Sequence, residues 1–258
     1  MTILEIRGLQ TSYNGSVPVL RDIHLKVEQG EFVGVIGPSG AGKSTLLRSI
    51  NRLIEVDAGT IVVPISLLDG RTGAGVDILK LAHSDLRHVR RRIGMIFQQF
   101  NIVKRLSVIE NVLAGGLGYQ PAWRSTLRFF SKEERRHALV NLKRVGLLDH
   151  AYKRADELSG GEQQRVAIAR TLMQEPAIIL ADEPVSSLDP KLSRVVLDIL
   201  ERVCREDGIT ALVSLHTLDL TREYAGRVVG LKDGQIVFDG ATEALTDSIV
   251  DSIYGPSD

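Results

Sequence analysis

The chain has 258 residues, of which 43% are apolar, and its 32 Lys and Arg residues balance its 32 Asp and Glu residues. This length and apolar content support a full α/β core and exclude a disordered chain, while zero net charge excludes a bulk basic field that would draw nucleic acid. The single cysteine, Cys204, excludes an internal disulfide and has no evident role.

Strand patterns dominate the first part of the chain. The opening residues, MTILEIRGLQ, are too polar and too short for a signal peptide, and no apolar run approaches the ~20 residues of a membrane span, so we expect a soluble chain. Ile23, Leu25 and Val27 alternate with polar residues, as in a half-buried strand. The apolar run 31–37, EFVGVIG, leads into glycines, and 45–53, TLLRSINRL, reads as a helix.

The pattern becomes helical from about Asn101 to Met173. In 131–146, SKEERRHALVNLKRVG, apolar residues recur at helical spacing, namely Ala138, Leu139, Leu142 and Val145. We therefore predict an inserted helical subdomain.

Strand signals return in 177–183, AIILADE, and in 209–216, ITALVSLH. The helix predicted between them has the apolar face Leu192, Val195, Val196, Ile199 and Val203. This alternation predicts a parallel sheet. The run 228–238, VVGLKDGQIVF, then reads as two strands joined by a turn at Asp233 and Gly234.

A glycine-rich loop separates the strand 31–37 from the helix 45–53. It fits G-x-x-x-x-G-K-[ST] and consists of Gly37, Pro38, Ser39, Gly40, Ala41, Gly42, Lys43, Ser44 and Thr45. Glycines let successive N–H groups point at a phosphate, and the following helix adds its positive end. We predict a nucleotide site in which Lys43 reaches the β- and γ-phosphates and Ser44 coordinates Mg²⁺. The alternative is a glycine-rich turn with a chance lysine.

Two acidic residues, Asp182 and Glu183, end the strand that begins at 177. Because α/β sheets gather ligands at the carboxyl ends of their strands, Asp182 is placed to hold the Mg²⁺ water shell. Glu183 would polarise the water that attacks the γ-phosphate, and general-base assistance is typically worth about 10²–10⁴ in rate. The alternative is that the pair caps the next turn, since Pro184 follows.

Three further residues are candidates for the same site. His216, at the end of 209–216, is predicted to hydrogen-bond near the γ-phosphate, against a structural role. Gln98, at the end of RIGMIFQ, is placed to complete the Mg²⁺ shell or touch the attacking water. Tyr13 offers a ring on which adenine could stack, although it also reads as an exposed turn tyrosine.

A second glycine loop, in LSGGEQQRVAIAR (158–170), raises a separate question. Ser159 and Glu162 form a capping-box pattern, but Gly160 and Gly161 each cost a helix about 1 kcal/mol relative to alanine. Bare backbone at a helix start suits an approaching anion, yet the chain already carries one phosphate loop. Both loops are used if the second closes over a nucleotide held by another copy, in a head-to-tail dimer with two shared sites.

These motifs together resemble those of the ATP-binding cassette (ABC) ATPases over essentially the whole chain. The phosphate loop, Gln98, LSGGEQQR, IILADEP, SSLD (186–189) and His216 occur in the family's order and spacing. The resemblance implies one ABC ATPase domain over 1–258 that binds and hydrolyses ATP. Its P-loop NTPase (RecA-like) core, with a parallel sheet and an antiparallel β subdomain, would comprise 1–100 and 171–258, and the helical subdomain 101–170.

The resemblance also implies roles across the dimer. Ser159 and Gly161 would act in trans on the γ-phosphate, and Asp189 would link the two sites. Asp189 followed by Pro190 also makes an ordinary helix start, N-cap then N1.

Family members without membrane spans usually serve separate membrane subunits. The segment 97–112, FQQFNIVKRLSVIENV, is similar to the segments that receive a coupling helix of an importer. Segments 119–136 and 205–240 resemble those of phosphonate-importer ATPases, and the related phosphite and hypophosphite systems are equally possible. The expected assembly has two copies of this chain, two membrane-spanning subunits and an extracytoplasmic binding protein. It would lie at the cytoplasmic face of a bacterial plasma membrane.

Other functions fit the sequence less well. A GTPase would need an N-K-x-D-type motif, which does not occur, and a small-molecule kinase has no use for LSGGEQQR. An importer ATPase for another small solute remains open. The main rival is a soluble cassette ATPase acting on DNA or ribosomes, but such proteins commonly fuse two cassettes or add coiled coils or basic arms, which this chain lacks.

Overall fold

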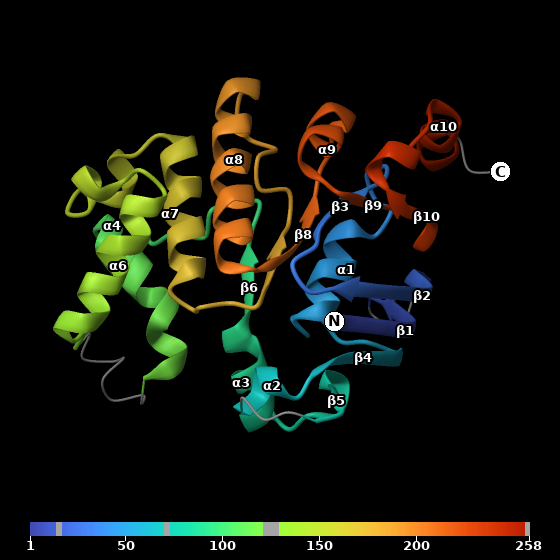
Figure 1. Ribbon diagram of the computed structural model, residues 1–258, viewed down its shortest axis with the longest axis horizontal. Coiled ribbons are helices and arrows are strands. Elements are labelled where there is room, and N and C mark those ends of the chain that lie inside the picture. Colours follow the sequence, from blue (N-terminus) through green and yellow to red (C-terminus); the bar gives the residue numbers. More distant parts are fainter. Residues whose placement is uncertain (14–16, 70–72, 121–128, 256–258) are drawn as a thin grey trace.

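The computed structural model describes residues 1–13, 17–69, 73–120 and 129–255 (Figure 1). A six-stranded sheet runs through it in the order β10-β9-β3-β8-β7-β6. Its strands are β3 (Phe32–Ile36), β6 (Ile93–Ile96), β7 (Ile178–Ala181), β8 (Thr210–Ser214), β9 (Arg227–Lys232) and β10 (Gln235–Ala241). Neighbouring strands are parallel except β9 and β10. The predicted parallel sheet is therefore confirmed.

The central strands are buried on both faces, which is why they read as continuous apolar runs. In β7, Ile178 and Leu180 face one core, whereas Ile179 and Ala181 face the other. The first core lies under an antiparallel sheet. The second is shared with the helices that follow β6.

The antiparallel sheet has the order β2-β1-β4-β5 and lies at the opposite end of the molecule from the helical segment (Figure 1). Its strands are β1 (Thr2–Ser12), β2 (Pro18–Glu28), β4 (Ala58–Pro64) and β5 (Gly75–Asp77). In β2, the residues Ile23, Leu25 and Val27 are buried and the polar residues between them are exposed, as the alternation predicted.

Helices cover both faces of the six-stranded sheet. The α-helices are α1 (Lys43–Ile50), α2 (Ser66–Asp69), α3 (His83–Arg92), α4 (Val108–Leu113), α6 (Lys132–Arg144), α7 (Gly160–Leu172), α8 (Pro190–Asp207), α9 (Leu218–Tyr224) and α10 (Asp247–Tyr254). The short 3₁₀ turns are η1 (Ile78–Lys80), η2 (Ala114–Tyr119), η3 (Leu148–His150), η4 (Ala155–Glu157) and η5 (Thr242–Ala244). Among the described residues, every helix is too short or too polar to cross a bilayer.

The helical segment predicted between β6 and β7 contains α4, α6 and α7, which pack together at one end of the molecule (Figure 1). In α6, Ala138 and Leu142 are buried, as is Val145 just beyond it, so the predicted periodicity is confirmed. Within 119–136, the residues 121–128, with Trp123, lie outside the described part of the chain.

Two sequence predictions need correction. Strand β7 ends at Ala181, so Asp182 lies one residue beyond it, and β8 ends at Ser214, so His216 lies two residues beyond it. Hydrogen bonding to β6 nevertheless continues past the end of β7, because the Asp182 amide donates to Ile96 O at 2.8 Å. On α8, the apolar residues Leu192 and Val195 are 37% and 39% exposed. Leu192 lies beside Gly161 of α7 instead of in the core.

Candidate functional site

The phosphate loop connects β3 to α1, and its shape requires glycine. Gly37, Gly40 and Gly42 have φ values of 148°, 83° and 101°, which side chains with a Cβ rarely adopt. A Cβ on Gly37 would lie 2.2 Å from Leu231 O, and one on Gly42 would lie 2.8 Å from Leu20 Cδ2. The loop is thus a backbone cradle ahead of a helix N-terminus, the arrangement that binds phosphate. Pro38, Ser39 and Ala41 complete it.

Lys43 is folded back over this loop. Its Nζ donates hydrogen bonds to Gly37 O at 2.7 Å and Pro38 O at 3.0 Å, and the residue is 4% exposed. Burial lowers the pKa of Lys43, opposed by the charges of Glu183 and Asp182. The cation therefore lies inside the cradle with two carboxylates nearby.

Asp182 is the buried acid of the site, at 1% exposure. Ser44 Oγ donates to its Oδ1 at 2.7 Å, and Arg48 Nη2 lies 2.9 Å from its Oδ2. The Ser44 and Asp182 oxygens are hard ligands of the kind Mg²⁺ prefers. Within the described ranges no cluster of three or more His, Cys, Asp or Glu side chains could hold a metal ion.

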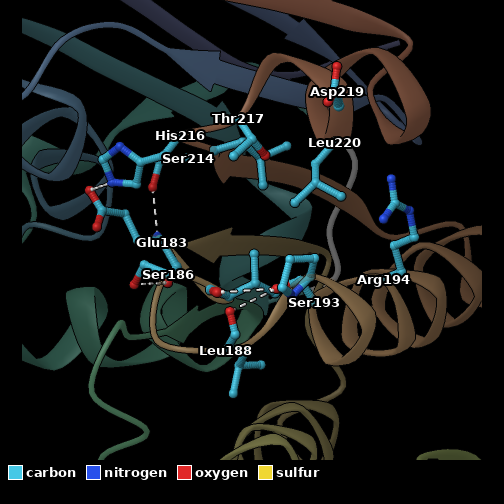
Figure 2. Close-up of a pocket in the computed structure, with 13 residues that line it drawn as sticks. Glu183, Ser186, Leu188, Ser193, Arg194, Ser214, His216, Thr217, Asp219 and Leu220 are labelled. Atoms are coloured by element: carbon cyan, nitrogen blue, oxygen red, sulfur yellow. Dashed lines mark hydrogen bonds and ion pairs between the residues drawn. The ribbon is translucent and has the colours of Figure 1, made fainter.

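Glu183 adopts an unusual backbone conformation for a residue with a side chain, with φ at 49°. Its amide donates to Ser214 Oγ at 2.7 Å, and its carboxylate Oε1 pairs with His216 Nε2 (Figure 2). Such strain costs about 1–3 kcal/mol and persists only where the surroundings hold it. Here Ser214 holds the backbone of Glu183 and His216 holds its carboxylate.

Glu183 lies between two cavities. One, of about 400 Å³, is lined by phosphate-loop residues together with Tyr13, Val19 and Glu183. The other, of about 420 Å³, lies between the loop after β7, α8 and the start of α9, and His216 and Ser214 also line it (Figure 2). Tyr13 OH is 3.3 Å from Thr45 Oγ1, and Tyr13 is 46% exposed, so its ring borders the phosphate cavity at the surface.

Gln98 lines neither of these cavities. It faces a third one, of about 620 Å³, with Gln99, Phe100, Asn101, Ile102, Lys104, Gln163 and Ser187. This cavity joins the loop after β6 to the start of α7 and to the loop before α8. The predicted role of Gln98 at the metal stays a prediction.

The second glycine loop has the predicted capping box at the start of α7. Ser159 Oγ donates to Glu162 Oε2 at 2.7 Å, and the Ser159 amide donates to the same oxygen at 2.8 Å. Neither Gly160 nor Gly161 has positive φ, and a Cβ on either would meet its nearest neighbour at 3.5 Å or 3.4 Å, ordinary contact distances. Within the part of the chain that the structure describes, nothing therefore demands glycine at these two positions.

Asp189 caps α8, as the Asp-Pro pattern predicted. Its Oδ1 accepts hydrogen bonds from the amides of Lys191 and Leu192, both at 3.0 Å, and Pro190 opens the helix. Its role across a dimer stays a prediction.

Two residues of the site were not anticipated from the sequence. Ser214 is a polar residue that interrupts the apolar run ALVSL (211–215), and that interruption was a usable signal. Arg48 gave no signal, because its partner Asp182 is 134 residues away in the chain.

Comparisons with known proteins agree with this geometry. The family described as "ABC transporter" matches residues 20–186. Phosphonates import ATP-binding protein PhnC 2 of Oceanobacillus iheyensis is 48% identical over 255 residues, which cover 99% of this chain and 96% of the relative. PhnC of Staphylococcus saprophyticus is 49% identical, covering 100% of this chain and 96% of the relative.

Solved structures give the same result. A dimeric post-hydrolysis state of the ATP-binding cassette MJ0796, bound to ADP and Pi, superposes with a TM-score of 0.78 at 32% identity, covering 94% of this chain and 100% of that one. The ADP conformation of the cassette MJ1267 gives 0.82 at 26% identity, covering 98% and 97%. The predicted family and fold class are confirmed: this chain belongs to the ABC transporter family, as one of its ATP-binding cassettes.

Proposed function

We propose that this chain is the ATP-hydrolysing subunit of an importer for a phosphonate, phosphite or related phosphorus oxyanion. The solute assignment is supported by relatives 48% and 49% identical over nearly the full chain, which are named phosphonates import ATP-binding proteins. No residue of a cassette on the cytoplasmic side needs to touch the solute. The choice of solute therefore depends on relatedness and not on site chemistry.

The observation that carries the mechanism is the pair Gly160 and Gly161. The described residues of one chain leave room for a Cβ at both positions, so glycine there favours close approach by a partner outside the chain. A second copy that presents its bound nucleotide to this helix start provides such a partner, since bare amides at a helix N-terminus bind anions. Two cassettes then face each other head to tail, with Asp189 near the seam. The dimeric form of a 32% identical cassette supports this arrangement.

Within one copy, the residues divide the work on ATP. The phosphate loop holds the phosphates, Lys43 turns its Nζ from the loop carbonyls to the β- and γ-phosphate oxygens, and the ring of Tyr13 carries the adenine. Ser44 and Asp182 would hold Mg²⁺, with Gln98 as a further ligand, and the ion would supply positive charge to neutralise the charge that develops on the phosphate oxygens.

Glu183 is the group that activates the attacking water. Its carboxylate takes the water's proton, and His216 keeps that carboxylate oriented. Ser159 and Gly161 of the opposite copy add hydrogen-bond donors to the γ-phosphate. Hydrolysis then weakens the contact between the copies and lets them separate.

The membrane subunits contact the cavity around Gln98. It combines apolar walls, Phe100 and Ile102, with the polar groups of Gln99, Gln163 and Ser187, and a cytoplasmic helix of a membrane subunit suits such a groove. Movement there reaches Glu183 through the short loop between Pro184 and Asp189. The complete assembly has two membrane subunits and an extracytoplasmic binding protein, and this chain lies peripherally at the cytoplasmic face.

Transport in proteoliposomes tests the proposal. The chain is reconstituted with its membrane subunits and binding protein, and uptake of a labelled phosphonate and of phosphite is followed with ATP inside. We expect ATP-dependent uptake of at least one of them, and about 10² or more loss with Glu183→Gln. Uptake unaffected by Glu183→Gln would contradict the assigned chemistry, and uptake of neither solute would contradict the assignment to phosphonate or phosphite.

A further inference from the structure

A histidine outside the family motifs touches the second glycine loop. His150 ends η3, and its Nδ1 lies 3.3 Å from Glu162 Oε1, with no hydrogen-bond partner of its own for this buried atom among the described residues. Glu162 is the capping residue whose other oxygen, Oε2, receives both the hydroxyl and the amide of Ser159. One carboxylate thus joins His150 to the serine of the glycine loop.

This link matters because the Ser159 hydroxyl has one proton to donate. In the structure that proton goes to Glu162 Oε2, at 2.7 Å. For Ser159 to bond a γ-phosphate oxygen held by another copy, the hydroxyl must leave the carboxylate. After it leaves, Oε2 retains the Ser159 amide at 2.8 Å, and Oε1 retains His150.

Hydrogen bonds and charges around Glu162 stabilise its carboxylate. The pKa of Glu162 is lowered, first by the hydrogen bond from the Ser159 side chain and further by the Ser159 amide and the charges of His150 and Arg165, against burial, which raises it. The hydroxyl bond is lost when Ser159 turns away, whereas the amide and the charges remain. Arg165 is already engaged elsewhere through its Nη1, which donates to Val145 O at 3.0 Å. His150 is itself held in place, since Leu147 and Ala151 on either side of η3 are 1% exposed.

We propose that His150 is a positioning residue for the trans-acting serine: by holding Glu162 Oε1, it keeps the carboxylate in place when the Ser159 hydroxyl turns to the opposite copy's γ-phosphate. This inference rests on the proposed composite site. Without His150, the Ser159 hydroxyl and amide are the remaining partners of Glu162, and the release of the hydroxyl costs more. The loss corresponds to one partly exposed ion-pair contact, or closure weaker by about 1.5- to 5-fold.

ATP-driven dimerisation of the full chain in the Glu183→Gln background measures this directly. The ATP concentration for half-maximal dimer is determined by light scattering, and ATP affinity of the separate chain is determined at low protein concentration. We expect His150→Leu to raise the half-maximal concentration about 1.5- to 5-fold while leaving the affinity of the separate chain unchanged. His150→Asn, which keeps a donor at the position of Nδ1, should restore most of the loss. His150→Ala gives the same comparison should His150→Leu not fold.

A matched control and a double variant separate positioning from general structure. His137 on α6 also approaches a glutamate, Glu175, at 3.9 Å, but lies away from the glycine loop, so His137→Leu should not alter closure. Because His150 acts only through Ser159, adding His150→Leu to Ser159→Ala should cause no further loss.

The possible failures are distinguishable. Additive losses in the double variant, equal losses from His137→Leu, or no loss from His150→Leu when Ser159→Ala weakens closure would overturn the role of His150. If Ser159→Ala itself leaves closure unchanged, the proposed composite site fails instead.

Discussion

Replacing Ser214 with alanine tests how the strained backbone of Glu183 is held. The Ser214 side chain is fully buried, and its Oγ accepts the Glu183 amide at 2.7 Å. In the Ser214→Ala variant that amide has lost its acceptor in a buried site. Leaving a buried donor unsatisfied costs about 1–3 kcal/mol, so urea unfolding should give a free energy of unfolding lower by this amount.

The same substitution should reduce turnover. Glu183 has a strained φ of 49°, and the hydrogen bond to Ser214 holds its backbone in this conformation. Without that hydrogen bond the backbone can relax, and the Glu183 carboxylate can leave the orientation in which it pairs with His216. If the full cost appears in the population of the working conformation, kcat for ATP falls about 5- to 150-fold. A phosphate-release assay measures it.

Thr171→Val is the matched control. Thr171 is equally buried, but its hydroxyl donates at 2.9 Å to Ala167 O, a carbonyl within α7, so no backbone donor is orphaned by its removal. Its turnover should remain close to that of the parent chain. If Ser214→Ala preserves both unfolding free energy and kcat, the proposed support of Glu183 by Ser214 is wrong.

Three further predictions concern other parts of the site and the core. In Gly42→Ala, the new Cβ meets Leu20 Cδ2 at 2.8 Å, and alanine must adopt a φ of 101°. Titration with a fluorescent nucleotide should therefore show ATP affinity reduced at least about tenfold. Unchanged affinity would refute the claim that this loop binds the phosphates. Tyr254→Phe removes the hydroxyl that accepts a hydrogen bond from the Gly37 amide at 3.3 Å, and the same titration should show ATP affinity reduced about two- to tenfold. The control variant Tyr224→Phe, at a tyrosine that hydrogen-bonds to Asp198, should not change ATP affinity. Burial raises the pKa of Cys204 to about 12, so a thiol reagent at pH 8 should not label the folded chain until urea unfolds it. Above pH 9.0 the free energy of unfolding should fall, because the thiol ionises in the unfolded chain but stays protonated in the folded chain. Rapid labelling of the folded chain would contradict this.

The sequence was sufficient where chemistry is local. The phosphate loop needs glycines at positive φ within a few residues, and the box formed by Ser159 and Glu162 spans one helical turn, so both leave readable patterns. The same is true of the turn at Asp233 and Gly234, whose φ values are 49° and 76°.

Contacts between distant residues could not be predicted in this way. Arg48 and Asp182, or His150 and Glu162, meet only because β7 lies near α1 and η3 packs beside α7, and the hydrophobic pattern does not specify such pairs. Leu192 was assigned to the core for a similar reason: its helical spacing fits the buried face, but its neighbour is the glycine loop. The local pattern predicts which side of a helix is apolar but not which residues pack against that side.

The central claim is that one nucleotide is enclosed by the phosphate loop of one copy and the glycine loop of another. Disulfide cross-linking tests it most directly, because the native Cys204 is buried and both Ser39 and Ser159 are exposed. A tagged chain carrying Ser39→Cys is mixed with an untagged chain carrying Ser159→Cys, both in the Glu183→Gln background, and oxidised with and without ATP. We predict a cross-linked pair of unlike chains that forms with ATP and not without it. Failure of the unlike chains to cross-link with ATP, while a chain carrying both cysteines cross-links within itself, would contradict the claim.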